Sequence, residues 1–348
     1  MAVVPRPARQ AASRLVADYR VFGLSVRTTL VLPCPRVPRS RRPDIALRVA
    51  RSSEFARARA DVGAASGRRW FCGARLQDGS RYLRWRGLFE FLISRDGRSI
   101  SYRSLDHATD ESLKAYLLGQ VLSFSLVARG DEPLHGTVIV IDGQAIVLTG
   151  DCGRGKSTLG AAFLARGFPI LSDDLVVAFE RKRRWAVHPG IPRIKLFPAI
   201  ARRFLEPDLA GTPMNNRTSK LVLPLRGGRT VRHAVPLKAV YVLAEPGARS
   251  SRDPVAQIKP LSGRQAFLEV IRGAFNLLAV ERERLAAQFA FATRLAGSVP
   301  IKRLTYPRRL SDLPAVCDAL LADVKSEPMQ QRGLRRRSGG ERRPARRG

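Results

Sequence analysis

The sequence predicts an α/β protein in which a phosphate-binding domain follows a small, mostly β domain and precedes a basic tail. Three observations support this fold class. Residues 150–157 read G-D-C-G-R-G-K-S, which has the form G-x-x-x-x-G-K-[ST]. Apolar and polar residues alternate repeatedly between residues 19 and 102, as in half-buried strands. Residues 325–348 carry eight arginines and no apolar periodicity, which is typical of disorder.

The glycine-rich run lies in the context that a phosphate-binding loop requires. Residues 144–149 predict a buried strand, and residues 157–166 predict a helix that Gly167 ends. Glycines let backbone N–H groups close around a polyphosphate, and the helix N-terminus favours anions. Lys156 is then a ligand-exposed charge for the β- and γ-phosphates, and Ser157 is a ligand for Mg²⁺. The predicted cofactors are ATP and Mg²⁺, and the predicted nucleotide-binding residues are Gly150, Asp151, Cys152, Gly153, Arg154, Gly155, Lys156, Ser157 and Thr158.

Composition limits the other functions. The formal net charge is +33, but the basic residues are mostly arginine. A GC-rich, Arg-biased genome explains this composition as well as a functional basic surface does. Aromatic-interleaved basic stretches and zinc-finger spacings are missing, so a nucleic-acid partner is the lesser alternative. The four cysteines are scattered and form no metal-binding pair. The sequence has no apolar run of membrane-spanning length and no signal-peptide pattern, so we expect a cytoplasmic protein without a membrane span.

The chain divides into four parts. Residues 1–16 are expected to form a flexible arm, residues 17–108 a small, mostly antiparallel β domain, residues 109–324 the catalytic domain and residues 325–348 a disordered tail. Asp110 is the expected cap of a helix at residues 111–128, whose wide apolar surface predicts burial between the two domains. Asp142-Gly143 predicts a hairpin turn before the loop. Later helices are expected at 265–276, 282–296 and 313–324, the second with an apolar face of Leu285, Phe289, Ala292 and Ala296.

Two adjacent acids provide the candidate chemistry. Asp173 and Asp174 interrupt an apolar run at residues 168–177. Adjacent carboxylates usually mark a solvated turn, but this run resumes at once and follows the phosphate-binding helix. Phosphoryl transfer needs one group to hold the metal and another to accept the nucleophile's proton. Because neighbouring strand residues point to opposite faces, we expect unequal roles for the pair. Asp174 is favoured as base and Asp173 as metal ligand beside Ser157, although the residues leave the assignment open.

Three further residues are candidates for the same site. His135 begins the hairpin that leads into the phosphate loop, so it is expected near the phosphates. Arg193 and Lys195 project from one side of a short predicted strand. Two interpretations of this cationic pair stay open: a solvated strand face, or stabilisation of the charge that develops during phosphoryl transfer.

These residues together resemble the catalytic domain of HPr serine kinase/phosphorylase. The matching residues, in the family's order and spacing, are His135-Gly136, residues 138–141, the loop at 150–157, Arg166-Gly167 and Ser172-Asp173-Asp174. The resemblance implies a P-loop kinase domain of the HPr kinase/phosphoenolpyruvate carboxykinase type that phosphorylates a seryl hydroxyl with ATP. It implies that Lys156 and Ser157 hold phosphates and magnesium, that Asp173 and Asp174 supply the base and a metal contact, and that His135 lies beside the transferring phosphate.

One segment departs from the family. Its later acidic Glu-Ile-Arg-Gly-type signature is replaced at residues 189–196 by Pro-Gly-Ile-Pro-Arg-Ile-Lys-Leu. The whole chain looks closer to HPr-kinase-like proteins of peptide tailoring, some of which resemble kinases of lasso-peptide precursors. The predicted partner is therefore a serine-bearing protein or peptide. Two alternatives are a nucleotide-gated binding protein without phosphotransfer and another phosphoryl enzyme on the phosphoenolpyruvate carboxykinase-like scaffold. The phosphoacceptor, phosphorolysis, homo-oligomer formation and the role of the N-terminal domain stay open.

Overall fold

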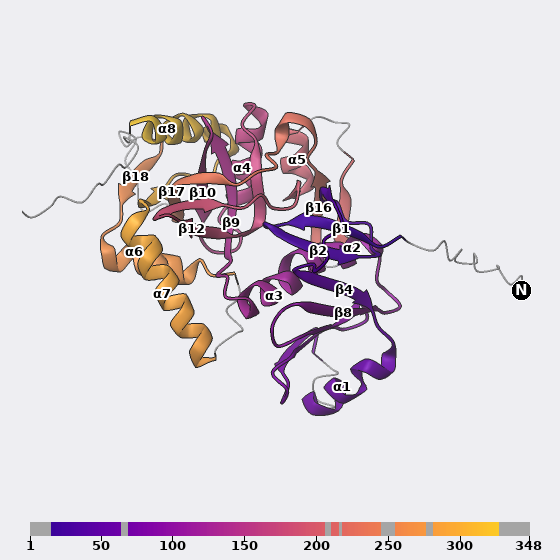
Figure 1. Ribbon diagram of the computed structural model, residues 1–348. Helices are drawn as coiled ribbons and strands as arrows, with labels where there is room; N and C mark the ends of the chain where they lie inside the picture. Colours follow the sequence, from indigo (N-terminus) through magenta and orange to yellow (C-terminus); the bar gives the residue numbers. More distant parts are fainter. Residues whose placement is uncertain are drawn as a thin grey trace, which may run out of the picture.

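Three β-sheets and eight α-helices organise the part of the chain that the structure describes (Figure 1). The structure is a computed structural model and describes residues 15–63, 69–205, 210–215, 218–244, 255–275 and 281–326. The mixed α/β class predicted from the sequence is therefore confirmed. The predicted arm lies outside the described residues except for its last two positions, and the predicted tail lies outside them beyond Ser326.

The first sheet is built only from strands of the N-terminal region. Its order is β3-β1-β2-β4-β8-β7-β6-β5, and all pairings are antiparallel except β2 with β4 and β4 with β8. A short 3₁₀ turn (Ser52–Phe55) and helix α1 (Ala56–Val62) follow β4, and the alternating pattern did not predict them. The strands are β1 (Ala17–Val21), β2 (Leu24–Thr28), β3 (Arg36–Val37), β4 (Ile45–Val49), β5 (Phe71–Arg75), β6 (Arg81–Trp85), β7 (Phe89–Ile93) and β8 (Ser99–Ser104).

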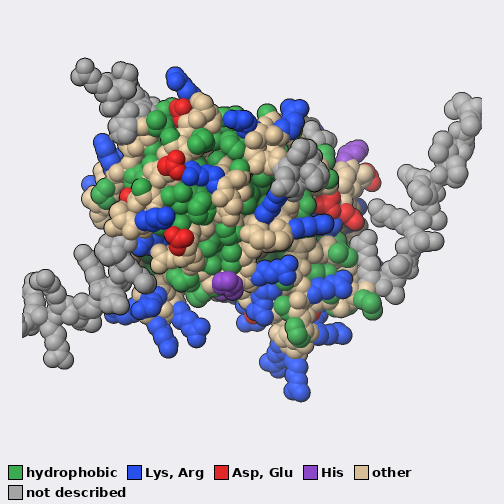
Figure 2. All heavy atoms as spheres, turned by 90° about the horizontal axis from the view of Figure 1, so that it is seen from above, with side chains coloured by type: hydrophobic (Ala, Val, Ile, Leu, Met, Phe, Trp, Pro, Cys, Tyr) green, Lys and Arg blue, Asp and Glu red, His purple; other side chains and the backbone are tan. Residues whose placement is uncertain are grey.

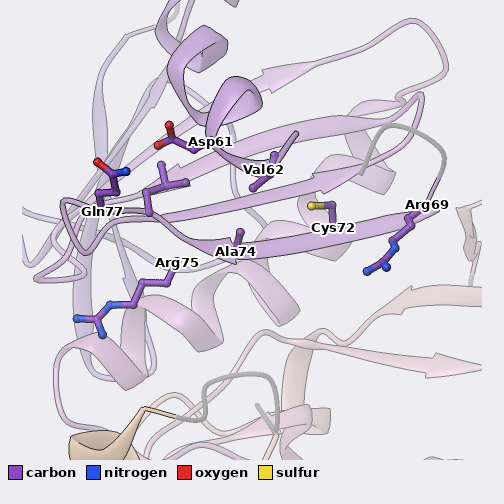
Figure 3. Close-up of a pocket in the computed structure, with 8 residues that line it drawn as sticks. Asp61, Val62, Arg69, Cys72, Ala74, Arg75 and Gln77 are labelled. Atoms are coloured by element: carbon purple, nitrogen blue, oxygen red, sulfur yellow. The ribbon is translucent and has the colours of Figure 1, made fainter. Parts of the chain in front are cut away.

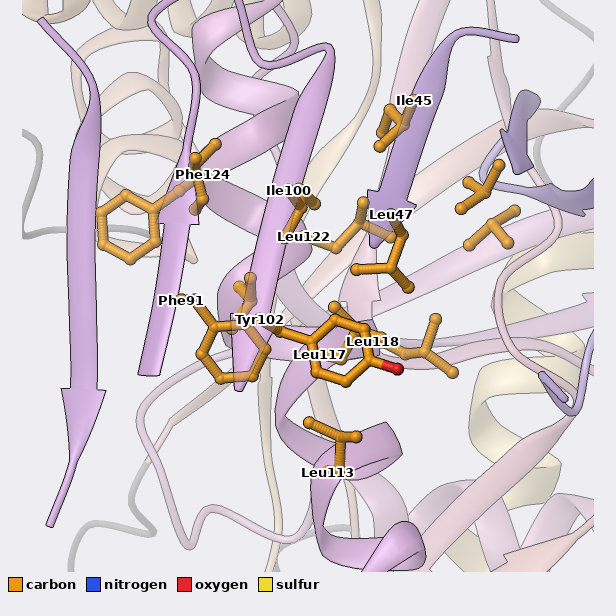
Figure 4. Close-up of a cluster of buried hydrophobic side chains, with 14 of the residues drawn as sticks. Ile45, Leu47, Phe91, Ile100, Tyr102, Leu113, Leu117, Leu118, Leu122 and Phe124 are labelled. Carbon is orange, nitrogen blue, oxygen red and sulfur yellow. The ribbon is translucent and has the colours of Figure 1, made fainter. Parts of the chain in front are cut away.

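A helical segment lies between this sheet and the rest of the molecule, as its wide apolar surface predicted. It consists of α2 (Asp110–Tyr116), a π-helical turn (Leu117–Val121) and α3 (Leu122–Ala128). Its buried leucines pack against strands β4, β7 and β8 in one apolar core (Figure 4). Two details correct the predictions. The segment is not one continuous α-helix, and its cap is Thr109 rather than Asp110, because the Thr109 hydroxyl accepts the N–H of Ser112 at 3.1 Å.

The second sheet carries the predicted hairpin and phosphate loop. Its order is β11-β9-β10-β17-β13-β12; β19 pairs with β17, and β18 pairs with β19. Residues Asp142 and Gly143 have φ angles of 48° and 73°, as a tight hairpin turn between β9 and β10 requires. The strands are β9 (Leu134–Ile141), β10 (Gln144–Thr149), β11 (Ile170–Val176), β12 (Ala178–Arg181), β13 (Arg184–Val187), β17 (Val235–Ala244), β18 (Gln257–Pro260) and β19 (Ile301–Thr305).

Helices cover both faces of this second sheet. One face packs against α4 (Lys156–Ala165), α5 (Pro198–Phe204) and α8 (Leu313–Ser326), and the other packs against α6 (Gly263–Arg272) and α7 (Arg282–Ser298). A small third sheet of β14 (Arg193–Leu196), β16 (Thr218–Pro224) and β15 (Thr212–Asn215) lies beside α4 and β11. Short 3₁₀ turns at Gly227–Arg229 and Leu310–Asp312 complete the described elements.

The predicted apolar face of α7 is wrong for Leu285 and Phe289, whereas Ala292 is buried and Ala296 packs against the core as predicted. Leu285 and Phe289 are 47% and 61% exposed, and Phe289 instead lies against Phe267, with ring centroids 4.9 Å apart. The helix is rotated because its other side packs on the sheet and because Arg284 forms a buried ion pair with Glu132 at 2.7 Å. The prediction failed because it counted only apolar residues, whereas the buried side of α7 also carries a charged and an amide side chain. The buried residues are Arg284, Gln288, Phe291, Ala292 and Leu295.

None of the helices in the described ranges is long and apolar enough to cross a bilayer.

Candidate functional site

Most of the predicted site residues converge on one cleft, with a volume of about 190 Å³, at the edge where the predicted phosphate loop, β9, β11 and the third sheet meet. A larger cavity, of about 430 Å³, lies beside the N-terminal strand β5 and α1 (Figure 3). That cavity contains none of the predicted site residues, so size alone does not mark the site. The cleft residues are His135, Gly136, Thr137, Cys152, Gly153, Gly155, Lys156, Ser157, Thr158, Asp173, Asp174, Lys195, Leu196, Phe197, Met214 and Lys220.

The loop between β10 and α4 needs its glycines. Gly150, Gly153 and Gly155 have φ angles of 129°, 80° and 90°, in the region that disfavours L side chains. A Cβ on Gly150 would also lie 2.9 Å from the Leu243 carbonyl oxygen of β17. The first turn of α4 begins at Lys156, and such a turn presents backbone N–H groups without intrahelical acceptors. This geometry suits an anion at the helix N-terminus.

The remaining loop residues take different positions. The exposed Cys152 and the helical Thr158 both line the cleft. Asp151 and Arg154 do not line it; they form an ion pair with each other at 3.2 Å, in which the Asp151 side chain is 74% exposed. Only part of the predicted nucleotide-binding run therefore faces the cleft with its side chains.

Lys156 lines the cleft but is buried, so its side chain is less exposed than the sequence predicted. Its residue is 6% exposed, and its Nζ donates hydrogen bonds to the carbonyl oxygens of Gly150 at 2.7 Å and Asp151 at 2.9 Å. Burial lowers the pKa of Lys156, although the nearby Asp173 and Asp174 carboxylates act in the opposite direction. The ammonium group thus closes the loop on itself.

Asp173 is held by three donors. Its Oδ1 accepts the hydroxyls of Thr137 at 2.7 Å and Ser157 at 2.9 Å, and its Oδ2 accepts the backbone N–H of Lys195 at 2.9 Å. These contacts fix the carboxylate beside the first turn of α4. The donor set of a serine hydroxyl and a carboxylate fits Mg²⁺, which prefers oxygen ligands and keeps several waters. Ser157 and Asp173 are therefore the residues that could hold the metal.

Asp174 has an unusual backbone that brings both acids to the same cleft. Strand β11 continues through the pair, but Asp174 has a φ of 82°, and the register against β9 shifts between Ile170 and Ser172. On a regular strand the two side chains would point to opposite faces. The left-handed residue removes that alternation, so both carboxylates line the cleft without the strand ending there.

Cations surround the Asp174 carboxylate. Lys195 Nζ donates to its Oδ2 at 2.6 Å, and His135 Nδ1 lies 3.8 Å from its Oδ1. Burial acts to raise the pKa of Asp174, but Lys195, His135 and Arg193 outweigh it and hold that pKa at about 2. Burial also lowers the pKa of His135, whereas the Asp174 carboxylate acts to raise it. Asp174 is consequently ionised throughout the physiological range.

Arg193 and Lys195 are both buried, so the interpretation as a solvated strand face is wrong. Lys195 lines the cleft and pairs with Asp174. Arg193 lies deeper and does not line the cleft; its Nη2 donates to the Ala115 carbonyl oxygen at 3.4 Å, and burial lowers its pKa. Its charge nevertheless contributes to the low pKa of Asp174. The two residues thus differ in position although they share a side of β14.

Sequence reasoning missed several residues that line the cleft. Thr137 was hidden in an apolar strand, and its position opposite Asp173 is visible only in the β9–β11 pairing of the structure. Phe197, Met214 and Lys220 come from the end of β14 and the β15–β16 hairpin, whose return over the cleft is a tertiary feature. Lys220 Nζ lies 5.2 Å from the centre of the Phe197 ring.

Replacing Lys195 by methionine is expected to raise the pKa of Asp174. Burial of the carboxylate raises this pKa, and the Lys195 charge is the main effect that lowers it. A depressed carboxylate pKa stabilises the folded protein above the ordinary value of 3.8, and this stabilisation is lost as the pH falls towards about 2. In Lys195→Met this stabilisation should be smaller, and its loss should be complete at a higher pH. Carboxyl NMR of Asp174 and acid unfolding would measure both effects, with Lys238→Met as the matched control. An unchanged pKa would show that the ion pair does not control Asp174.

The fold and the cleft define an α/β protein in which a glycine-rich strand–loop–helix segment meets paired carboxylates. Curated relatives carry a name that fits this class. The chain is 49% identical over 69 residues to an HPr kinase/phosphorylase of Burkholderia lata, covering 20% of this chain and 19% of the relative. It is 36% identical over 69 residues to an HPr kinase/phosphorylase of Burkholderia cenocepacia, with the same shares. The resemblance is thus confirmed for a segment, and the chain spans about a fifth of the length of these relatives.

The chain was also compared with solved structures and with family models. A solved structure of the HPr(Ser) kinase/phosphatase from Coxiella burnetii matches with a TM-score of 0.31 and 15% identity, covering 56% of this chain and 96% of that chain. No family model matches the sequence. The similarity to known proteins is therefore to HPr kinase/phosphorylases and rests on a short segment.

Proposed function

We propose that the protein is an ATP-dependent serine kinase that transfers the γ-phosphate to a seryl hydroxyl of a protein or peptide. One observation carries the proposal. The same cleft is lined by the loop lysine, by the oxygen ligands Ser157 and Asp173 that could hold Mg²⁺, and by the ionised carboxylate of Asp174. Phosphoryl transfer needs this combination of a phosphate cradle, a metal site and a proton acceptor. The relatives named HPr kinase/phosphorylase support the same class of reaction.

Nucleotide binding would use the loop and the start of α4. The backbone N–H groups of the loop and the first helical turn would receive the phosphates, and Lys156 would turn from the Gly150 and Asp151 carbonyls to the β- and γ-phosphates. Ser157 and Asp173 would hold Mg²⁺, which when bound neutralises charge on the phosphate oxygens. The hydrogen bonds from Thr137 and Lys195 keep the Asp173 carboxylate oriented for that contact.

The transfer step would place the acceptor hydroxyl beside Asp174. The serine oxygen forms the new bond to the γ-phosphorus as the bond to the bridging β,γ-oxygen breaks, and ADP leaves with that oxygen. Asp174 takes the hydroxyl proton. Lys195 pairs with Asp174 at 2.6 Å and would also offset charge on the transferring group. His135 borders the carboxylate and hydrogen-bonds the Asp174 backbone oxygen at 3.1 Å, which helps to fix its position.

The acceptor side of the cleft would be formed by Phe197, Met214 and Lys220. Phe197 is 49% exposed, so the wall that meets the acceptor combines apolar surface with a cation. Such a wall suits a peptide segment rather than a small polar metabolite. Basic side chains lie in several separate groups on the face shown in Figure 2. We further propose that the enzyme acts in the cytoplasm.

Incubation of the protein with γ-labelled ATP, Mg²⁺ and the peptides encoded beside its gene tests the proposal. Label should appear on a serine of one peptide, and the same peptide with that serine changed to alanine is the control. Saturable nucleotide binding without transfer to any peptide or protein would instead support a nucleotide-gated binding protein. Transfer to a small carboxylate metabolite would support the phosphoenolpyruvate carboxykinase-like alternative.

A further inference from the structure

The π-helical turn at Leu117–Val121 touches the Lys195–Asp174 pair. Gly119 is buried in this turn, and a Cβ placed on it would lie 3.1 Å from Asp174 Oδ2 and 3.9 Å from Lys195 Nζ. The first distance is tighter than ordinary van der Waals contact. Glycine is therefore the residue that lets the helix backbone approach this ion pair without displacing it. π-turns inside helices occur often at functional sites.

A second contact joins the same helical segment to the same strand. Arg193, two residues before Lys195 on β14, donates to the carbonyl oxygen of Ala115, four residues before Gly119. The helical segment therefore meets β14 at two successive turns. The Asn215 side chain also donates to the Tyr116 hydroxyl at 2.8 Å, which ties the β15 strand to α2. Three contacts thus fix the third sheet, and with it Lys195, against this helix.

The other side of the helical segment belongs to the N-terminal sheet. Leu117, Leu118 and Leu122 pack with Leu47 of β4 and Ile100 of β8 in the core shown in Figure 4. All five side chains are 5% exposed or less. Close-packed interiors transmit displacements because they contain little free space. The position of Gly119 is consequently set by the N-terminal sheet.

We infer that Gly119 is a positioning residue for phosphoryl transfer, through which the N-terminal sheet holds the Asp174 carboxylate and the Lys195 ammonium in register with the phosphate loop. This inference rests on the proposed kinase function and assigns the N-terminal domain a role in it. Gly119 approaches Asp174 and Lys195, whereas Lys156 is held by Gly150 and Asp151. Nucleotide binding and transfer rate should therefore respond differently to changes at the turn.

Gly119→Ala is expected to lower kcat by about tenfold to a hundredfold, because small misplacements of catalytic groups have effects of this size. The nucleotide KM should change by less than about twofold, a split that distinguishes lost transition-state geometry from lost binding. The matched control is Gly297→Ala on α7, a helical glycine with no atom within 4 Å of the added Cβ. It should leave both constants unchanged.

A milder variant keeps the inference testable if Gly119→Ala does not fold. Leu47→Val removes one methylene from the core beneath the turn, and its matched control is Leu92→Val on the opposite face of the sheet, beside Phe55 and Tyr82. Leu47→Val should lower kcat at constant nucleotide KM, and Leu92→Val should not. Wild-type kcat in both Gly119→Ala and Leu47→Val would overturn the inference. A wild-type protein that transfers no phosphate would instead overturn the proposed function.

Discussion

Asp174→Asn is expected to lower the rate of phosphate transfer by about 10²–10⁴-fold, the usual contribution of a positioned proton acceptor. The substitution keeps the size of the side chain but removes the charge that pairs with Lys195 at 2.6 Å. Nucleotide affinity should stay close to wild type, because Asp174 hydrogen-bonds neither Ser157 nor the loop lysine in the described structure. The measurement is the transfer rate to a fixed peptide beside a nucleotide titration.

Asp173→Asn is the matched neighbour and should behave differently. Its carboxylate accepts two hydroxyls on Oδ1 and a backbone N–H on Oδ2, and an amide can accept on only one of these two positions. The hydroxyls of Thr137 and Ser157 can accept a hydrogen bond as well as donate one, whereas the Lys195 N–H can only donate. We therefore expect weaker Mg-nucleotide binding, slower transfer and a loss of stability of about 1–2 kcal/mol.

The difference between the two variants is the informative result. Near-normal transfer rates in both would mean that the acidic pair is structural, and the proposed kinase would lose its chemistry. Equal losses of affinity in both would mean that Asp174 also belongs to the metal site. Unequal roles for the pair were predicted from strand alternation. The structure instead brings both carboxylates to one cleft, because Asp174 is left-handed, and gives them different partners.

Local patterns predicted much of the fold. The Asp142-Gly143 turn, the strand–loop–helix around residues 150–157 and the strand at β17 are encoded by neighbouring residues, so the sequence alone predicts them. The rotation of α7 could not be predicted in the same way. Its buried side includes Arg284 because Glu132, far away in the chain, provides a partner, and no periodicity of apolar residues records that pairing.

The site was predictable where chemistry follows the motif and not where it depends on tertiary contacts. The loop lysine, Ser157 and the acidic pair follow from spacing. The burial of Lys195 and its ion pair with Asp174 required the third sheet to fold beside β11, and the role of Gly119 required a helix of the N-terminal half to reach the same point. A glycine inside a helical pattern is an ambiguous signal, because it is tolerated in many helices without a special contact.

Lys156→Met is expected to abolish detectable transfer and to weaken nucleotide binding, because no other side chain of the loop offers a cation to the β- and γ-phosphates from inside the cleft. The fold should tolerate the change. Methionine keeps the apolar stem and loses two hydrogen bonds to Gly150 and Asp151, but it also removes a buried ammonium whose pKa is already lowered by burial. These effects oppose each other, so the free energy of unfolding without nucleotide should change by less than about 1 kcal/mol.

The matched control is Lys182→Met, which changes an exposed lysine outside the cleft and should leave both transfer and binding intact. Thermal unfolding with and without Mg-ATP separates the two roles of Lys156. Wild type should gain stability from the nucleotide by mass action, and Lys156→Met should gain much less. If Lys156→Met kept the full nucleotide-dependent shift and the wild-type transfer rate, the loop would not be the phosphate site. If Lys156→Met instead unfolded without nucleotide, the two hydrogen bonds to Gly150 and Asp151 would stabilise the fold by more than burial of the ammonium group destabilises it. The conservative variant Lys156→Arg would then be used to test nucleotide binding.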